Sequence, residues 1–278
     1  MKFIRKHLST IIVILFLVVG LCLLLYPTVS DYWNSFYQTR AVANYVDAVQ
    51  KLDKEDYQRL WKEAQEYNKT LITKPDRWHL TKKDWKVYNK LLDVGKNGII
   101  GYIEIPKIKV SLPIYHGVDE GVLQIAIGHI AGSSLPTGGK NTHCVLSGHR
   151  GLPSAKLFTN LDQMEEGDIF MLQVLDKTLT YQVDQIRIVK PDNMEYLDIE
   201  QGKDLCTLVT CTPYGVNSHR LLVRGHRIAN VNARDVGASD ALQIDPFLVA
   251  TAMGVPVCIL LIIGVFIRTR KSRRGKGD

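Results

Sequence analysis

The stretch TLVTCTPYGVNSHRLLVRGHR, residues 207–227, places a cysteine where a predicted strand ends. The β-branched run before Cys211 predicts the strand, and the Thr212-Pro213 pair after it predicts a turn. A side chain at a strand end is raised out of the sheet, where a second molecule can reach it. Because a thiolate is a strong nucleophile, Cys211 is a candidate for covalent catalysis. The alternative is a small buried core cysteine, which the turn directly after position 211 argues against.

A thiol needs a base or a cation beside it before it can attack a substrate. His149 follows the apolar run CVLS and a glycine, so it also stands at a predicted strand end. His129, His219 and His226 are alternatives, and a single histidine is often structural. His149 is the one that shares the kind of position that Cys211 has.

The second half of the same stretch returns an arginine toward the cysteine. A hairpin over residues 207–225 folds the second strand back beside the first and brings Arg220 near Cys211. A guanidinium is charged at any relevant pH and can stabilise a carbonyl oxygen as it becomes an oxyanion. Arg150 and Arg224 compete for this role, and the alternative for each is a surface arginine in a salt bridge. No Cys or His pair has the short spacing of a zinc site, so we expect no metal and no other cofactor.

The formal net charge of +7 is concentrated at the two ends of the 278-residue chain. Residues 1–7 carry three basic side chains, and residues 268–278 carry six together with one acid. The chain between these tails is close to neutral. The basic composition therefore does not indicate a nucleic-acid-binding face, and we expect no nucleic acid partner.

Each basic tail adjoins an uncharged apolar run, residues 8–26 and 247–267, about as long as a membrane-spanning helix requires. The alternative for the first run is a cleaved signal peptide, but the run is long for one and no small-residue cleavage site follows it. The basic flanks predict that both tails are cytoplasmic. The extracellular part then comprises a helical lead-in (27–93), a catalytic domain (94–228) and a polar tether (229–246).

The lead-in has the pattern of helices. Apolar residues recur every three or four positions over residues 56–71, which predicts a first amphipathic helix. A second helix is expected to begin at Thr81, because Thr81 and Asp84 have the spacing of a capping box. The segment between them, KPDRWHL at residues 74–80, is a polar loop with one large aromatic side chain.

After Gly98 the pattern changes to short β-rich runs separated by Gly, Pro, Asn and Asp. The runs are IIGYIEI (99–105), VSLPIY (110–115), CVLS (144–147), IFMLQV (169–174), LTYQVDQIRIV (179–189), CTLVT (206–210) and RLLVRG (220–225). We interpret GVDEGVLQIAIGH and GLPSAKLF as helical or turn insertions. Seven or eight strands at this spacing predict a mainly β domain, a barrel or a sandwich.

Several blocks of the sequence resemble the sortases, the cysteine transpeptidases of Gram-positive cell surfaces. In chain order they are GYIEIPKI (101–108), LPIYHGV (112–118), GHIAGSSLPTGG (128–139), HCVLSGHRG (143–151) and TLVTCTPYGVNSHRLLVRGHR (207–227). The combination of TCTPYG and HRLLVRG with a helical lead-in and a second membrane span resembles class C, the sortases that polymerise pilins.

The resemblance implies a closed eight-stranded β-barrel with Cys211 as nucleophile, His149 as general acid and base, and Arg220 as the cation that orients substrate and stabilises the oxyanion. It implies cleavage of an LPXTG-like sorting signal between Thr and Gly, a thioacyl enzyme, and transfer to a lysine amine of a pilin or to a cell-wall amine. One alternative is a sortase that attaches proteins to peptidoglycan. Another is a non-catalytic surface scaffold or adhesin.

Class C sortases usually carry a lid in which Asp-Pro is followed by an aromatic residue. Here the corresponding loop, residues 74–80, has Pro75, Asp76 and Trp78 in a different order. The resemblance implies that Asp76 lies near the catalytic cation and that Trp78 fills an apolar pocket, and the alternative is an open loop.

The five cysteines are too few for a disulfide framework. Cys22 and Cys258 lie in the apolar runs, which leaves Cys144, Cys206 and Cys211 in the exported part. Cys144 and Cys206 each lie five residues before a candidate catalytic residue, so they become neighbours if their strands are adjacent and parallel. A disulfide between them is one option, but cross-strand geometry often disfavours it.

Overall fold

The computed structural model describes residues 2–231, 252 and 254–264. The chain divides into two compact units, one made of residues 1–33 and 241–278 and the other of residues 34–240. The second unit contains the described strands together with Cys211, His149 and Arg220.

The helices in the described elements are α1 (Lys2–Gln50), α2 (Lys54–Ile72), α3 (Lys82–Tyr88) and α4 (Glu120–Leu123), with 3-10 turns η1 (Pro106–Ile108), η2 (Leu161–Gln163) and η3 (Glu195–Leu197). The strands are β1 (Ile99–Ile105), β2 (Val110–His116), β3 (Ile127–His129), β4 (Thr142–Ser147), β5 (Ile169–Val174), β6 (Lys177–Val189), β7 (Asp204–Thr212) and β8 (His219–Arg227).

Helix α1 contains the first predicted membrane run and continues well past it. Pro27 lies inside the helix, so the predicted boundary between residues 26 and 27 is not a break in secondary structure. Proline removes one backbone hydrogen bond, a local loss that the many other turns of a long helix outweigh. From Thr10 to Gln50 the helix is long and apolar enough to cross a membrane.

The second predicted membrane run lies partly outside the described residues. Its described part forms a helix, Gly254–Gly264, that is shorter than a full membrane span. The tail at residues 268–278 and most of the tether at residues 229–246 also lie outside the described residues. A second membrane span is therefore not confirmed.

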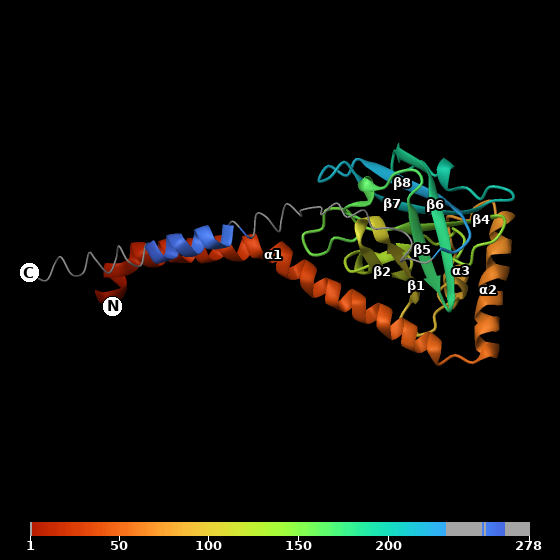
Figure 1. Ribbon diagram of the computed structural model, residues 1–278, viewed down its shortest axis with the longest axis horizontal. Coiled ribbons are helices and arrows are strands. Elements are labelled where there is room, and N and C mark those ends of the chain that lie inside the picture. Colours follow the sequence, from red (N-terminus) through yellow and green to blue (C-terminus); the bar gives the residue numbers. More distant parts are fainter. Residues whose placement is uncertain (1, 232–251, 253, 265–278) are drawn as a thin grey trace, which may run out of the picture. The chain divides into compact units, whose positions relative to one another are not determined.

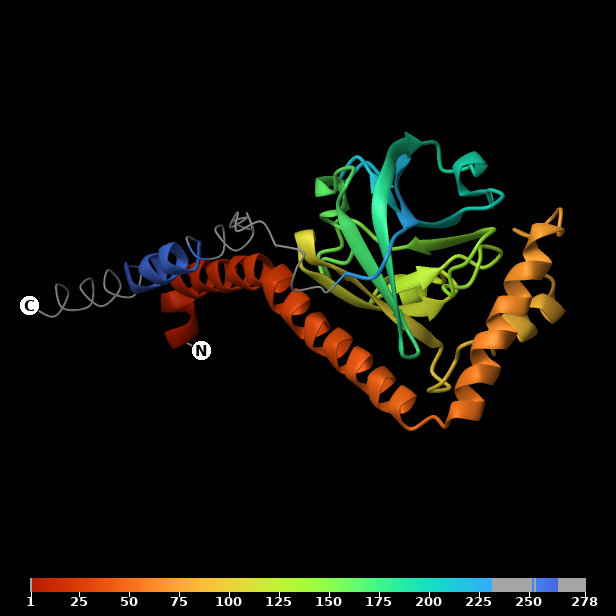
Figure 2. The ribbon, with the colours of Figure 1, turned by 45° about the vertical axis from the view of Figure 1, so that its right-hand side comes forward.

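The strands close into a barrel in the order β1-β2-β3-β4-β7-β8-β6-β5 (Figures 1 and 2). This confirms the closed eight-stranded barrel that the resemblance implies. The pairs β2–β3 and β4–β7 are parallel and the other neighbours are antiparallel. The parallel β4–β7 pair puts the carboxyl ends of two strands at the same edge of the sheet.

Strand β3 differs from the sequence prediction, which interprets its segment GVDEGVLQIAIGH as an insertion. The segment contains the short helix α4 followed by three strand residues. Ile127 pairs with Ile114 of β2, and His129 pairs with Leu146 of β4. Pairing with neighbours on both sides, rather than local pattern, makes this segment a strand and completes the barrel.

The two faces of the barrel wall bury different sets of side chains. The inner face contributes to the main core, and in β7 and β4 it presents Cys206, Leu208, Cys144 and Leu146. The outer face carries a second cluster, hereafter the outer cluster, composed of Val145, Val189, Leu197, Val209 and Leu222. Side chains alternate along a strand, so Cys211 shares the outer face with Val209, and Arg220 shares it with Leu222.

Helices of the lead-in cover one side of the barrel (Figure 1). The apolar stripe of α2, including Leu60, Trp61 and Ala64, belongs to the main core. Helix α3 begins with the predicted capping box, in which Thr81 and Asp84 satisfy each other's backbone N–H groups. At its end the buried Tyr88 hydroxyl contacts His129 Nδ1 at 2.8 Å, which ties the helix to β3.

Candidate active site

Cys211 is the outward-facing residue at the carboxyl end of β7. The two outward positions before it, Thr207 and Val209, are buried, whereas Cys211 itself is half-exposed. Strand β7 ends at Thr212 and a cis Thr212-Pro213 bond follows, so the chain turns away directly after the thiol. Burial on the outer face of β7 therefore decreases toward the sulfur, which is partly accessible.

His149 follows the end of β4, beside the end of β7. Ser147 pairs with Val209 in the parallel β4–β7 register, and the amide of Gly148 donates to the carbonyl of Val209 at 3.0 Å. The hydroxyl of Thr210 donates to the carbonyl of Gly148 at 2.8 Å. Continuing this alignment along both chains puts His149 level with Cys211.

The residue before the histidine has to be a glycine. A Cβ on Gly148 would lie 2.8 Å from side-chain atoms of both Ile127 and Phe158, which are fully buried. The backbone at the end of β4 thus approaches the core closely, and this contact fixes the position of the His149 backbone. The His149 Nε2 atom is buried and has no hydrogen-bond partner among the residues that the structure describes. No described protein group competes for this nitrogen, as proton exchange with a substrate requires, and the atom is closed to solvent in this structure.

Arg220 lies directly across from the cysteine. In the antiparallel β7–β8 pair, Cys211 is the Cα partner of Arg220, as the predicted hairpin requires. The guanidinium donates to the backbone carbonyls of Asn217 and His219, at 3.2 and 3.1 Å. Within the described part of the chain no carboxylate neutralises it, so its charge is available to an anionic group at the site.

The competing residues are held in other interactions. Arg150 pairs with Asp162 at 2.5 Å and donates to Thr212 at 3.2 Å. Arg224 pairs with Asp184 and with Glu200. Their positive charges are therefore balanced by acids, unlike that of Arg220.

The alternative histidines also have partners. His129 is fully buried and contacts the Tyr88 hydroxyl, Ser133 and the carbonyl of Ser134. His219 contacts Ser218 at 2.9 Å. The exposed His226 lies 3.7 Å from Asp184 toward the far end of β8. His219 is also beside the end of β7, as the Cα partner of Thr212, but of the four histidines considered only His149 has a buried ring nitrogen without a partner among the described residues.

A cavity of about 670 Å³ adjoins the site. It begins at residues next to Cys211 and Arg220 in the chain, and its lining consists of Arg150, Asp162, Ile186, Arg187, Ile188, Thr212, Pro213, Tyr214 and Leu221. The lining is mixed, with apolar walls and three charged side chains. Cys211, His149 and Arg220 do not line it, and Thr212 and Leu221 alternate with Cys211 and Arg220, so they belong to the other face of β7 and β8.

The loop at residues 74–80 lies against the same outer face. Trp78 is half-buried and packs against the outer cluster. Asp76, however, contacts His79 Nδ1 at 2.5 Å, and its side chain is 74% exposed. The described residues thus show no ion pair between Asp76 and Arg220. The residue that sequence analysis missed is Arg77, which is only 6% exposed and contacts the barrel.

Cys144 and Cys206 are neighbours, as expected if their strands are parallel. They form a directly opposed pair in the β4–β7 register, and both are buried, free thiols. Burial raises the pKa of Cys206 well above its ordinary value. Burial also disfavours the Cys144 thiolate, but hydrogen bonds from Cys206 and His129 outweigh it and lower the pKa of Cys144. Both lie on the inner face, away from the site.

The geometry supports acyl transfer through a thioester. A thiol, an imidazole with a free nitrogen and an unneutralised guanidinium come from the ends of three adjacent strands, β7, β4 and β8. These groups have the chemistry that a nucleophile, a proton carrier and an oxyanion-stabilising charge require. Among the described residues there is no group of three or more His, Cys, Asp or Glu side chains that could hold a metal ion.

Comparison with known proteins places this chain in a family. The family model for the sortase domain matches residues 103–228. The crystal structure of sortase C1 from Streptococcus agalactiae is 55% identical, covers 69% of this chain and all of that chain, and has a TM-score of 0.68. The chain therefore belongs to the sortase family. Sortases are cysteine transpeptidases, and within them this protein is a class C sortase.

Other relatives agree. Sortase C from Streptococcus pneumoniae is 45% identical, with coverage of 69% and 98% of the two chains and a TM-score of 0.63. The lid mutant of Streptococcus agalactiae sortase C1 is 43% identical, with coverage of 66% and 95% and a TM-score of 0.61. Sortase D from Bacillus subtilis is 32% identical over 131 residues, which span 46% of this chain and 63% of that protein.

Proposed function

We propose that this protein is a membrane-anchored extracellular transpeptidase that joins pilins. Cys211 is the nucleophile, His149 the general acid and base, and Arg220 the oxyanion-stabilising cation. The observation that carries the proposal is the meeting of these residues at one strand-end edge, with Cys211 directly opposite Arg220.

In the first half-reaction the Cys211 thiolate attacks the threonine carbonyl of an LPXTG-like sorting signal. The carbonyl oxygen becomes an oxyanion beside the Arg220 guanidinium. The Thr–Gly C–N bond then breaks, the protonated His149 gives its proton to the departing glycine amine, and a thioester remains on Cys211.

In the second half-reaction a pilin lysine amine attacks the thioester carbonyl. His149 accepts a proton from the amine, the C–S bond breaks, and the Cys211 thiolate is restored as an isopeptide bond forms. Covalent catalysis divides one difficult amide exchange into two easier steps. Pilins are the proposed substrates because the related Streptococcus pneumoniae sortase C is described in terms of its pilin substrate specificity.

The direct test is capture of the thioester. The full-length protein is incubated with an LPXTG-type peptide and its intact mass is measured. We expect the mass to increase by the acyl fragment up to threonine, and Cys211→Ala to show no increase. Absence of the adduct in the parent protein, or its presence in Cys211→Ala, contradicts the proposed chemistry and favours a non-catalytic scaffold or adhesin.

The amine that accepts the acyl group distinguishes pilus assembly from attachment to peptidoglycan. The parent protein is supplied with a pilin that carries its acceptor lysine or has Arg in its place. We expect covalent pilin oligomers only with the lysine. Transfer to a peptidoglycan-like amine at equal rates with both pilins identifies the anchoring alternative instead.

We also propose that loop 74–80 acts as a lid over the outer face beside Cys211. Support comes from the packing of Trp78 against the outer cluster and from the existence of a lid in the related Streptococcus agalactiae sortase C1. If the loop covers the thiol, Asp76→Ala combined with Trp78→Ala raises the rate at which Cys211 is alkylated. An unchanged rate contradicts a lid.

For the membrane, we propose two spans with both tails in the cytoplasm. The apolar length of α1 and the basic residues at 1–7 and 268–278 support this topology. Single cysteines introduced into each tail of a Cys-free variant should react with a membrane-impermeant maleimide only after permeabilisation. Labelling of the C-terminal tail in intact cells contradicts the second span.

A further inference from the structure

Arg77 occupies a position where a charged side chain is unexpected. In this chain the lid segment reads Asp76-Arg77-Trp78, so an arginine stands where the usual class C pattern has proline. The Arg77 side chain is 8% exposed although the loop around it is polar. A buried guanidinium is stable only if hydrogen bonds and an acid compensate for the lost hydration.

The compensating contacts come from two separate parts of the barrel domain. Nη2 donates to Asp198 Oδ1 at 2.8 Å and to the carbonyl of Leu197 at 3.2 Å. Nη1 lies 3.5 Å from the carbonyl of Gly132, which belongs to the loop after β3. One side chain therefore joins the lid to the β3–β4 loop and to the connection between β6 and β7.

The backbone contact at Gly132 is also close. Gly132 has a φ of +94°, and a Cβ at this position would lie 2.2 Å from the carbonyl oxygen of Arg77. No other residue type fits there without movement of the lid. The lid backbone thus lies directly on the β3–β4 loop at Arg77.

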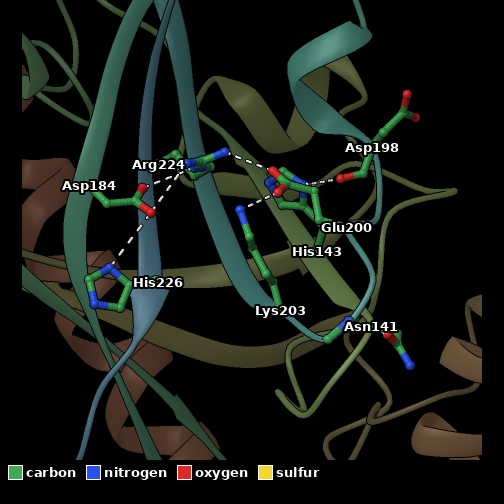
Figure 3. A network of polar contacts seen from close by, with 9 residues as sticks. Asn141, His143, Asp184, Asp198, Glu200, Lys203, Arg224 and His226 are labelled. Atoms are coloured by element: carbon green, nitrogen blue, oxygen red, sulfur yellow. Dashed lines mark hydrogen bonds and ion pairs between the residues drawn. The ribbon is translucent and has the colours of Figure 1, made fainter.

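The β6–β7 connection that receives Arg77 is itself fastened to the barrel (Figure 3). The ring of His143, on β4, contacts the carbonyl of Asp198 through Nδ1 at 2.7 Å. Arg224, on β8, bridges Asp184 and Glu200, and Glu200 also pairs with Lys203. Arg77 therefore attaches the lid to a fixed support.

Arg77 also lies over the ring of Trp78. Its guanidinium carbon is 4.3 Å from the centroid of the Trp78 ring, and the ring packs against the outer cluster. Two members of that cluster, Val209 and Leu222, are two residues from Cys211 and Arg220 on β7 and β8. Fastening Arg77 thus keeps Trp78 on the face that carries the reactive thiol.

Asp76 makes no comparable contact. Its carboxylate and the His79 ring are 74% and 83% exposed, and they contact each other within the loop. An exposed pair of this kind contributes little to holding the lid.

We propose that Arg77 is the positioning residue that holds the lid closed. Its contacts with Asp198, Leu197 and Gly132 take the place of a contact between the lid aspartate and the catalytic cation. Release of these contacts frees Trp78 and opens the outer face beside Cys211. The inference rests on the proposed lid, but it does not depend on which substrate the enzyme uses.

The test measures how fast Cys211 is alkylated by iodoacetamide in the full-length protein, read as the modified fraction of the Cys211 peptide by mass spectrometry. If alkylation follows the open fraction of the lid, Arg77→Ala should react about tenfold faster than the parent, the effect of losing a charged hydrogen bond. Arg77→Lys should fall between the two, because an ammonium keeps the charge without the planar fork. Asp198→Asn, which changes an exposed partner, should give about a threefold increase.

Two controls make the outcome specific. Asp76→Ala changes the adjacent lid residue and should alkylate at the parental rate. The buried thiols of Cys144 and Cys206 report on the fold, since they should stay unmodified while the barrel is intact. If Arg77→Ala exposes those thiols, the alkylation rates of Asp198→Asn and Arg77→Lys are compared with that of the parent instead.

A parental rate in the folded Arg77 and Asp198 variants overturns the proposal, and so does an Asp76→Ala rate as high as that of Arg77→Ala. Alkylation requires no substrate, so the result is independent of the thioester experiment. Faster alkylation of Arg77→Ala in a protein that forms no thioester supports Arg77 as the lid anchor and contradicts the transpeptidase chemistry. Thioester formation with unchanged alkylation rates supports the chemistry and contradicts the anchor.

Discussion

Cys211 and Arg220 are directly opposed residues of the antiparallel β7–β8 pair. Opposed residues in such a pair have Cα atoms about 4.5 to 5.5 Å apart, and their side chains leave the sheet on the same face. The turn of residues 213–218 therefore does more than reverse the chain. Its length sets the register that puts the guanidinium, rather than Leu221, across from the sulfur.

This register predicts the effect of removing the cation. Arg220→Ala should lower kcat/KM for an LPXTG-type peptide by about 100- to 1,000-fold, as expected for loss of an oxyanion-stabilising group. Arg220→Lys should recover only part of this loss, because it keeps the charge but not the paired donors. Arg59→Ala, on the exposed face of α2, is the matched control. A loss of less than about threefold in Arg220→Ala means that the oxyanion is stabilised elsewhere.

The free nitrogen of His149 predicts a second kinetic phenotype. His149→Gln should lower transpeptidation by about 100- to 10,000-fold, because proton transfer to the departing amine and from the incoming amine is lost. His226→Gln, at the far end of β8, should retain parental activity and serves as the control. Comparable activities in the two variants, measured by kcat/KM, rule out His149 as the proton carrier.

The buried pair Cys144 and Cys206 predicts the number of free thiols that labelling should find. Protein purified without reductant and labelled in denaturant should show three free thiols between residues 28 and 245, because Cys144 and Cys206 are both free on the inner face. The Cys211→Ala variant should show two. A mass about 2 Da below the reduced value, with only Cys211 labelled, indicates instead that a disulfide joins the two opposed strand positions.

Much of the barrel is predictable because most of its strands are short β-rich runs bounded by turn residues, a signal that is local in the sequence. The runs at residues 99–105 and 169–174 coincide with β1 and β5, and the capping box at Thr81 marks the start of α3. Strand β3 could not be predicted, since three residues carry too little periodicity and the segment is a strand only through its neighbours.

Some residues of the site are likewise predictable from local sequence signals, and others are not. Strand ends and a hairpin indicate Cys211, His149 and Arg220, because these signals depend on nearby residues. Arg77 gives no such signal, since an arginine in a polar loop is normally solvated. Its burial depends on Asp198, which is 121 positions away in the chain, and on the packing of the β6–β7 connection against β4.

That packing predicts how stability depends on pH. His143 is fully buried between the carbonyl of Asp198 and the hydroxyl of Thr207, each 2.7 Å from a ring nitrogen. A carbonyl only accepts, so Nδ1 carries the proton and Nε2 accepts from Thr207. Burial, aided by the positive charges of Arg224 and Arg77, lowers the pKa of His143 from 6.5 to about 4.

The direction in which stability changes with pH depends on which state binds more protons. Between pH 6.5 and about 4 the unfolded chain binds a proton at His143 and the folded chain does not, so acid favours unfolding in this window. The stabilisation is fully present above pH 6.5 and is lost as the pH falls toward 4, by roughly 3 kcal/mol for this residue. His116, whose pKa burial also lowers to about 4, should add a similar amount.

Urea unfolding at about pH 7, 6 and 5 measures this dependence. The parent protein should lose stability steadily across the series, and His143→Gln should lose roughly half as much, because of these two residues only His116 then has a pKa that folding lowers. His143→Gln is expected to be less stable than the parent at about pH 7, since the contact with Asp198 is altered, so the slope rather than the absolute value is the criterion. Equal slopes in the two proteins mean that His143 has the same pKa in the folded and unfolded states. A ring buried between the carbonyl of Asp198 and the hydroxyl of Thr207 cannot gain a proton as easily as a solvated one, so equal slopes also contradict the placement of His143 beneath the β6–β7 connection.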